Sequence, residues 1–152
     1  MPLLPGTRFG EIEFADADVI QFEQGLIGFD ALKRFLLIPS KEGSAFAWLQ
    51  SVDEPTLSFL VTDPALFVDE YEPILSESLR VEMRLLDSTP RLLLTTVSIP
   101  HGRPEQTSLN LAGPILINVQ ERIGRQFVVE NEAYTIKYRV FSDREIEERP
   151  AA

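Results

Sequence analysis

Short apolar segments recur along the whole chain, and many of them alternate with polar residues. Ile12 and Phe14 alternate with Glu11 and Glu13, the period of two that places apolar side chains on one face of a pleated strand. Other segments are short, rich in aromatic or β-branched residues, and bounded by Pro, Gly, Ser or Asp. We predict strands at residues 11–14, 19–22, 35–38, 46–52, 57–61, 92–99, 109–111, 115–119, 127–129 and 134–141.

One segment has helical spacing. Apolar residues at positions 75, 79, 83 and 86 fall on one face of a helix, and the hydroxyl of Ser76 can accept from the first free backbone N–H groups. Positions 79–85 also alternate like a strand, which is the competing interpretation. We predict a helix over 76–86 because both of its ends are marked.

Many short strands with one short helix favour a mainly β protein, a small antiparallel β-barrel-like fold, over βαβ units. Gly25 and Gly28 predict a shaped loop after the second strand, and residues 120–126, which include Gly124, predict a hairpin loop longer than two residues. We expect one domain over 1–141 and a mobile charged tail over 142–152.

Composition narrows the class of function. The 152 residues include no cysteine, which fits a reducing cytosol, and no apolar run approaches the ~20 residues of a membrane span. The chain does not start with a secretory signal, so we expect a cytoplasmic protein. The net charge of −10 argues against direct nucleic-acid binding, which depends on clustered Lys and Arg. Acidic residues outnumber basic ones by 14 to 5 in residues 1–80, which suits either steering of a basic partner or simple solubility.

The sequence offers little for catalysis. His101 is the single histidine and lies in a predicted loop, and without cysteine a zinc site is improbable, so no metal or cofactor is expected. Acidic pairs occur in polar segments, where they are usually solvated. The alternative to a binding protein is a small β-barrel hydrolase or carbohydrate-binding module that uses Asp63, Asp69 or His101.

The remaining distinctive features suit a binding surface. Pro114 interrupts an otherwise apolar strand and cannot donate to a sheet ladder, so it belongs at an edge or a bulge, and an edge can accept another chain. The competing interpretation is that Gly113 and Pro114 only bend a strand at a barrel corner. Phe29 and Phe67 also have two interpretations: each is either a contact on the binding surface or an ordinary core residue.

An ordered set of motifs along the chain resembles the bacterial flagellar assembly factor FliW family. The motifs are Phe9-Gly10-Glu11-Ile12, Phe22-Glu23-Gln24-Gly25-Leu26-Ile27-Gly28-Phe29, Phe46-Ala47-Trp48-Leu49-Gln50-Ser51, Val61-Thr62-Asp63-Pro64 followed by Tyr71 and Pro73, Val97-Ser98-Ile99-Pro100, and Asn110-Leu111-Ala112-Gly113-Pro114-Ile115-Leu116-Ile117-Asn118. They span nearly the whole chain. One departure is that Glu23 and Ile27 stand where the family pattern has prolines.

The resemblance implies a β-barrel-like protein that binds flagellin in the cytoplasm. It also implies binding to the RNA-binding translational repressor CsrA. This binding would block repression without contact at the RNA site of CsrA. Flagellin that accumulates would capture the protein and release CsrA. From this family pattern and expected loop or edge exposure, we predict partner contacts at Phe29, Phe67, Asp69, Tyr71, Asn110, Leu111, Pro114 and Ile115.

Overall fold

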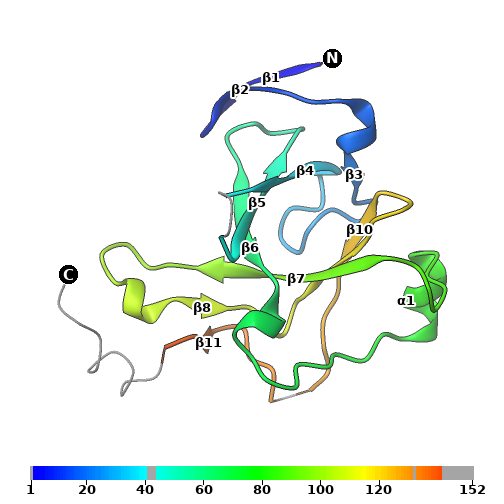
Figure 1. The fold of residues 1–152 in the computed structure, drawn as a ribbon, viewed down its shortest axis with the longest axis vertical. Helices are drawn as coiled ribbons and strands as arrows, with labels where there is room; N and C mark the ends of the chain where they lie inside the picture. The colour runs from blue at the N-terminus through cyan, green and yellow to red at the C-terminus, as the bar shows by residue number, and fades with distance from the viewer. Residues whose placement is uncertain (1, 41–43, 132, 142–152) are drawn as a thin grey trace.

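The protein is built around a closed β-barrel (Figure 1). In the computed structural model, residues 2–40, 44–131 and 133–141 are described. Seven strands form the closed circuit, in the order β7-β6-β5-β4-β3-β10-β9 with β9 paired back to β7. Their bounds are β3 Ile20–Gln21, β4 Arg34–Pro39, β5 Phe46–Ser51, β6 Ser58–Thr62, β7 Arg91–Ser98, β9 Ile115–Asn118 and β10 Ile123–Gln126. All neighbouring barrel strands are antiparallel except β3 and β10, which are parallel.

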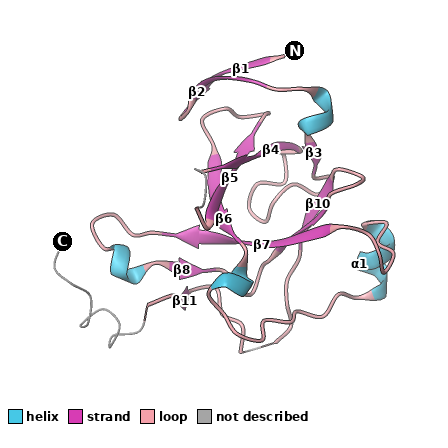
Figure 2. Ribbon diagram, in the orientation of Figure 1, coloured by secondary structure: helices cyan, strands magenta, loops and turns pink. Residues whose placement is uncertain are grey.

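Two small additions extend the barrel. The hairpin of β1 (Leu3–Thr7) and β2 (Gly10–Glu13) lies across one end, at the top of Figure 1. At the opposite side, β8 (Ser108–Leu109) pairs with the end of β7, and β11 (Tyr138–Arg139) pairs with β8. Figure 2 shows the helical segments between the strands: α1 (Glu77–Glu82) and the 3-10 turns Asp16–Asp18, Pro64–Leu66 and Pro104–Gln106.

Most predicted elements are confirmed. The barrel-like fold with one short α-helix is present, and strands form within or across the predicted ranges 11–14, 19–22, 35–38, 46–52, 57–61, 92–99, 109–111 and 115–119. The strand β1 was not predicted, because its two-residue spacing is hidden by the prolines and glycine of Met1-Pro2-Leu3-Leu4-Pro5-Gly6. The predicted mobile tail, 142–152, lies outside the described residues.

The predicted strand at 127–129 is wrong, since the chain pairs earlier, as β10. Gly124 lies in the middle of β10 opposite Ile117, and a Cβ on Gly124 would come within 2.3 Å of the Phe22 ring. Glycine therefore permits a close approach between strand and ring instead of marking a loop. The hairpin itself is confirmed, with a shorter connection, 119–122, in which Arg122 has a positive φ of 56°.

The strand predicted at 134–141 is confirmed over two residues only, and its predicted length is wrong. Only Tyr138 and Arg139 pair with β8, and Ile136 is 67% exposed. Apolar and polar residues alternate along the segment, but most of its residues are exposed. Tyr134 instead contacts Tyr71, with ring centroids 4.7 Å apart.

The strand β9 separates two of the three hydrophobic clusters. Ile115 and Ile117 point into the barrel core with Phe22, Phe35 and other buried residues, whereas Leu116 packs on the other side with Leu79 and Met83 of the helical segment. All four residues of β9 are buried, so both of its faces are covered. A third cluster, Leu4, Phe14, Val19, Leu36 and Val52, joins the β1–β2 hairpin to the barrel.

The helix α1 begins where the sequence predicts and ends earlier. The Ser76 hydroxyl accepts from the backbone N–H of Leu79 at 3.2 Å, the expected N-cap. Buried Asn118 fixes the other end, because its Nδ2 donates to the carbonyl of Met83 at 2.8 Å. Leu86, placed in the helix by periodicity, lies beyond it and is 74% exposed.

Candidate protein-binding surface

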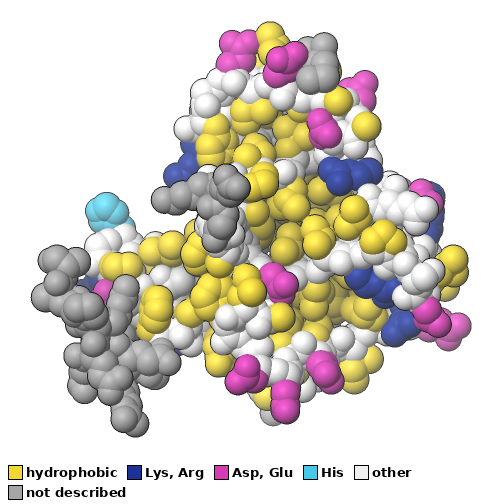
Figure 3. Space-filling model, in the orientation of Figure 1, with side chains coloured by type: hydrophobic (Ala, Val, Ile, Leu, Met, Phe, Trp, Pro, Cys, Tyr) yellow, Lys and Arg dark blue, Asp and Glu magenta, His cyan; other side chains and the backbone are white. Residues whose placement is uncertain are grey.

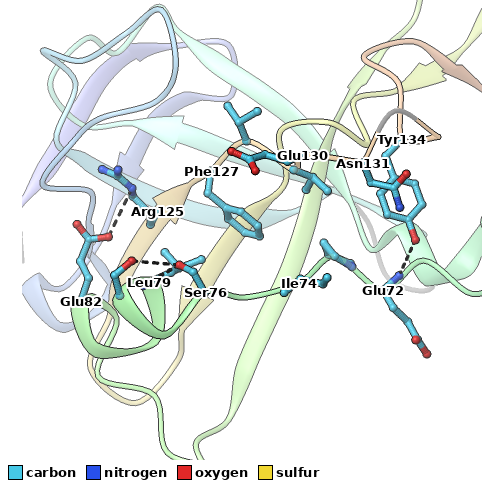
Figure 4. Close-up of a pocket in the computed structure, with 14 residues that line it drawn as sticks. Glu72, Ile74, Ser76, Leu79, Glu82, Arg125, Phe127, Glu130, Asn131 and Tyr134 are labelled. Carbon is cyan, nitrogen blue, oxygen red and sulfur yellow. Dashed lines mark hydrogen bonds and ion pairs between the residues drawn. The ribbon is translucent and has the colours of Figure 1, made fainter.

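A groove of about 710 Å³ runs between the segment that leads into α1 and the chain that leaves β10 (Figure 4). We call it the α1 groove. One wall comes from residues 72–79 with Glu82, and the other from Arg125, residues 127–131 and Tyr134. It is the size of pockets that bind small ligands or parts of partner chains.

Pro114 determines where the second wall begins. The N–H of Phe127 donates to the carbonyl of Pro114 at 3.1 Å, but Pro114 has no N–H to return to Phe127. The β9–β10 ladder therefore ends at Gln126 opposite Ile115. Beyond this point the chain keeps single hydrogen bonds to the carbonyls of Pro114 and Ala112 and forms the groove wall.

The groove combines an apolar floor with exposed apolar rims. Phe127 packs against the buried cluster of Leu79, Met83 and Leu116, and its ring faces the groove in Figure 4. Ile74 on one wall is 88% exposed, and Val128 on the other is 67% exposed. Large apolar side chains exposed on both sides of one groove are typical of a contact surface.

The charged groups around the groove are mostly acidic. Glu72, Glu82 and Glu130 line it, together with Arg125, whose guanidinium lies 3.5 Å from the Glu82 carboxylate. The face of the molecule in Figure 3 shows hydrophobic side chains across the barrel and acidic side chains along the lower edge. Such a groove favours a ligand that is both apolar and basic.

Two tyrosines close one end of the groove region. The Tyr71 hydroxyl donates to the carbonyl of Leu111 at 2.5 Å, and the Tyr134 hydroxyl accepts from the N–H of Glu72 at 3.2 Å. The rings meet edge to face at 71°. Burial, with a smaller contribution from Tyr134, raises the pKa of Tyr71 far above its usual value, so its hydroxyl stays protonated and remains a donor.

Some predicted contact residues are buried in the fold. Tyr71 and Leu111 are in contact, but Leu111, Pro114 and Ile115 are all buried, so their expected exposure is wrong. Pro114 does not lie on a sheet edge, because β9, which follows it, pairs on both sides. The half-buried Asn110 supports the same turn, its Oδ1 accepting from the N–H of Gly113 at 3.0 Å.

The other predicted residues lie outside the groove lining. Phe29 is 38% exposed and meets Phe59 edge-on at 5.1 Å, whereas half-buried Phe67 stacks on Phe46 at 6.0 Å. Asp69 is exposed on the loop before Tyr71. Sequence reasoning missed Ile74, Phe127, Val128 and Glu130 as contact residues; the one signal was the apolar pair Ile74 and Leu75 between Pro73 and Ser76.

The residues of the alternative function do not form a common centre in the structure. Asp63 caps a 3-10 turn, its Oδ1 accepting from the N–H of Ala65 at 2.9 Å, and His101 lies in an exposed turn. Within 2–40, 44–131 and 133–141, no group of three or more His, Cys, Asp or Glu could hold a metal ion. In the same residues, no helix is long and apolar enough to cross a membrane.

Comparison with known proteins decides the family. The family model described as FliW protein matches residues 4–140. A flagellar assembly factor FliW from Magnetococcus marinus is 41% identical over 128 residues, which cover 84% of this chain and 79% of that protein. One from Leptospira interrogans is 35% identical over 139 residues, covering 91% of this chain and 93% of that protein. The chain belongs to the FliW family.

The fold agrees with a solved FliW structure. A crystal structure of the flagellar assembly factor FliW matches with a TM-score of 0.86 at 29% identity, covering 94% of this chain and 99% of that one. The barrel predicted from the FliW resemblance is thus confirmed.

The loop that contains Gly25 and Gly28 is held by a hydrogen bond that a proline at position 27 could not make. The N–H of Ile27, which a proline would lack, donates to Oε1 of Gln126 at 2.8 Å, and Nε2 of Gln126 donates to the carbonyl of Gly113 at 2.8 Å. Gly25 is required in the same loop, because it has a φ of 65° and a Cβ there would lie 2.5 Å from the carbonyl oxygen of Phe29. One glutamine therefore holds the loop and the Gly113 turn together.

Proposed function

We propose that the protein is a cytoplasmic flagellar assembly factor that binds flagellin and antagonises CsrA, and that it acts by protein binding and not by catalysis. The observation that carries the proposal is the FliW family match over residues 4–140. Its relatives are named flagellar assembly factors.

The charge distribution supports a basic protein partner. A net charge of −10 attracts a basic RNA-binding protein and disfavours the phosphate backbone of its RNA. Antagonism through the protein partner alone is therefore physically consistent. Attraction of this kind raises the association rate and weakens with salt.

The proposed regulation is an exchange of partners. The free protein holds CsrA away from flagellin messenger RNA, and unexported flagellin captures the protein and releases CsrA to repress translation. If flagellin and CsrA bind in competition, each must weaken the apparent affinity of the other, because linkage between two ligands of one protein is reciprocal.

The test is a pulldown followed by competition. The tagged protein should retain flagellin and CsrA from its native host, and added flagellin should release bound CsrA. Titration calorimetry with each purified partner should give a stoichiometric complex that weakens as salt is raised. Absence of binding to both partners at micromolar concentration would refute the proposal.

The control separates protein binding from the alternative function. Asp63→Ala with Asp69→Ala and His101→Ala removes the side chains of the alternative function. Because Asp69 is itself a predicted partner contact, retained binding to flagellin and CsrA is expected of the double variant Asp63→Ala with His101→Ala. A hydrolytic activity lost in the triple variant would favour the alternative.

A further inference from the structure

We propose that the α1 groove binds an extended segment of a protein partner, and that this segment carries an apolar side chain flanked by Lys or Arg. The proposal rests on the function proposed above only in the choice of flagellin and CsrA as the first test proteins. It assigns a surface and a binding mode that are independent of the partner's name.

The backbone of the groove wall has one paired side and one open side. Phe127 and Val129 donate to the carbonyls of Pro114 and Ala112 at 3.1 and 2.8 Å. Because these bonds are two residues apart, the backbone groups of Val128 and Glu130 point to the opposite side. Within the described part of the chain, no backbone hydrogen bond satisfies Val128 or Glu130.

This open side decides between an extended and a helical ligand. An added strand would pair with the free N–H and C=O groups of Val128 and Glu130, as in other cases of β-strand addition. A helix satisfies its own backbone and would leave these groups unpaired against a dry surface, which is unfavourable. The groove wall therefore favours an extended segment.

The apolar surface supplies a position for the ligand's side chain. Phe127 forms the floor, and Ile74 and Val128 stand exposed on either side. Side chains of a strand alternate, so one side chain would enter between these residues while its neighbours point outward. Its burial would cover two side chains that are now 88% and 67% exposed.

The charges define the flanking residues of the ligand. Glu82 has Arg125 as its ion-pair partner, but no Lys or Arg in the described residues pairs with Glu72 or Glu130. These two carboxylates lie on opposite walls of the groove. They complement Lys or Arg on either side of the apolar residue and repel an acidic segment.

Variants of the groove test the binding mode. Val128→Pro removes the outward N–H at an exposed position where no internal hydrogen bond is lost, and Val128→Ala keeps the N–H as its matched control. Glu72→Lys with Glu130→Lys reverses the groove charge, and Glu11→Lys with Glu13→Lys makes the same change on β2. Unchanged circular dichroism and melting temperature verify that each variant is folded.

Calorimetry with flagellin and with CsrA gives the first readout. We expect the proline and groove-charge variants to lose about tenfold or more in affinity for one of the two proteins, and both controls to stay near wild type. Amide hydrogen exchange should slow at Val128 and Glu130 in that complex. If wild type and all variants bind both proteins equally, the groove assignment is overturned while the proposed function stands.

A second experiment applies if the wild-type protein binds neither flagellin nor CsrA. A random peptide display library is selected on wild type after depletion on a variant with both Val128→Pro and Glu130→Lys. Peptides with an apolar residue between basic ones support the proposal; recovery of none, or of peptides that bind both proteins equally, overturns it. A dimer by sedimentation that the groove-charge variant abolishes identifies a second copy as the occupant and also overturns it.

Discussion

The hydroxyl of Tyr71 donates to the backbone carbonyl of Leu111 across 40 residues of sequence, at 2.5 Å. This bond ties the loop before α1 to the turn before β9. The loop leads into one wall of the α1 groove, and the turn holds the other wall through the carbonyls of Ala112 and Pro114, so the two predicted contact residues position a surface that they do not line.

Tyr71→Phe should therefore destabilise the protein by about 0.5–1.5 kcal/mol, the usual net value of one hydrogen bond. The ring contact with Tyr134 is kept, so the loss reports the hydroxyl alone. Denaturant unfolding measures it, with Tyr138→Phe, 36% exposed, as the control. Equal stability of the two variants would contradict the assignment.

Asn118→Ala should lower the free energy of unfolding by about 2–3 kcal/mol, because it leaves several backbone groups without hydrogen-bond partners. The Asn118 side chain donates to Met83 and accepts from the N–H groups of Gln120 and Glu121, both at 3.1 Å. Gln120→Ala, at an exposed neighbouring site, should change little. Thermal unfolding compares the two, and a small loss for Asn118→Ala would show that water replaces these bonds.

Gly124→Ala should destabilise the barrel by about 1–3 kcal/mol, since the added Cβ overlaps the Phe22 ring. Phe22→Leu alone should also destabilise, because it removes part of a buried ring. The double variant should be more stable than the sum of the two losses predicts. Strict additivity in chemical denaturation would mean that the overlap is relieved elsewhere.

Asp53 should make stability depend on pH in the acid range. Burial alone would raise its pKa, but hydrogen bonds from the backbone of Lys33 and from Arg34 outweigh burial and lower it below 3.8. A lowered pKa gives stability that is present at pH values above the unfolded-state pKa of 3.8 and is lost as pH falls through the folded-state pKa.

Asp53→Asn should thus lower the unfolding free energy by about 0.5–1 kcal/mol at neutral pH, a value kept small by solvent screening. The difference from wild type should shrink as pH falls below 3.8. Urea unfolding at several pH values measures it, with Asp16→Asn as an exposed control. A difference that persists at the lowest pH would exclude the charge as its cause.

Ile27→Pro restores the residue of the family pattern and removes the N–H that Gln126 accepts. Gln126→Leu alone should lower the free energy of unfolding by about 0.5–1.5 kcal/mol. In the Ile27→Pro background the same change should cost less, because one of its two hydrogen bonds is already absent. A double-mutant cycle by thermal unfolding checks this, and no coupling would mean that Ile27 and Gln126 act separately.

The strands β4 to β7 and β9 could be located from sequence because each is a short run rich in apolar residues bounded by turn residues. The start of α1 could be located because Ser76 is a typical N-cap residue. The barrel's closure between β7 and β9 was expected only as a general architecture, because register across distant strands leaves no local signal.

The misplaced elements show what local pattern cannot report. Gly124 is typical of a loop in sequence, and only the fold shows that the Phe22 ring packs against it. Residues 134–141 alternate like a strand although only Tyr138 and Arg139 pair with β8. The groove was missed for the same reason: Ile74 and Val128 are far apart in sequence, and only the fold places them on facing walls.

The parallel contact between β3 and β10 also constrains how the chain can fold during synthesis. Gln21 meets Ile123, and the guanidinium of Arg122 reaches the carbonyl of Asp18 across 104 residues. The meander from β3 to β6 can pair as it leaves the ribosome, but its open edge stays exposed until β9 and β10 have emerged. Barrel closure is therefore a late, high-contact-order step, and nascent chains that stop before β9 expose a sheet edge prone to aggregation.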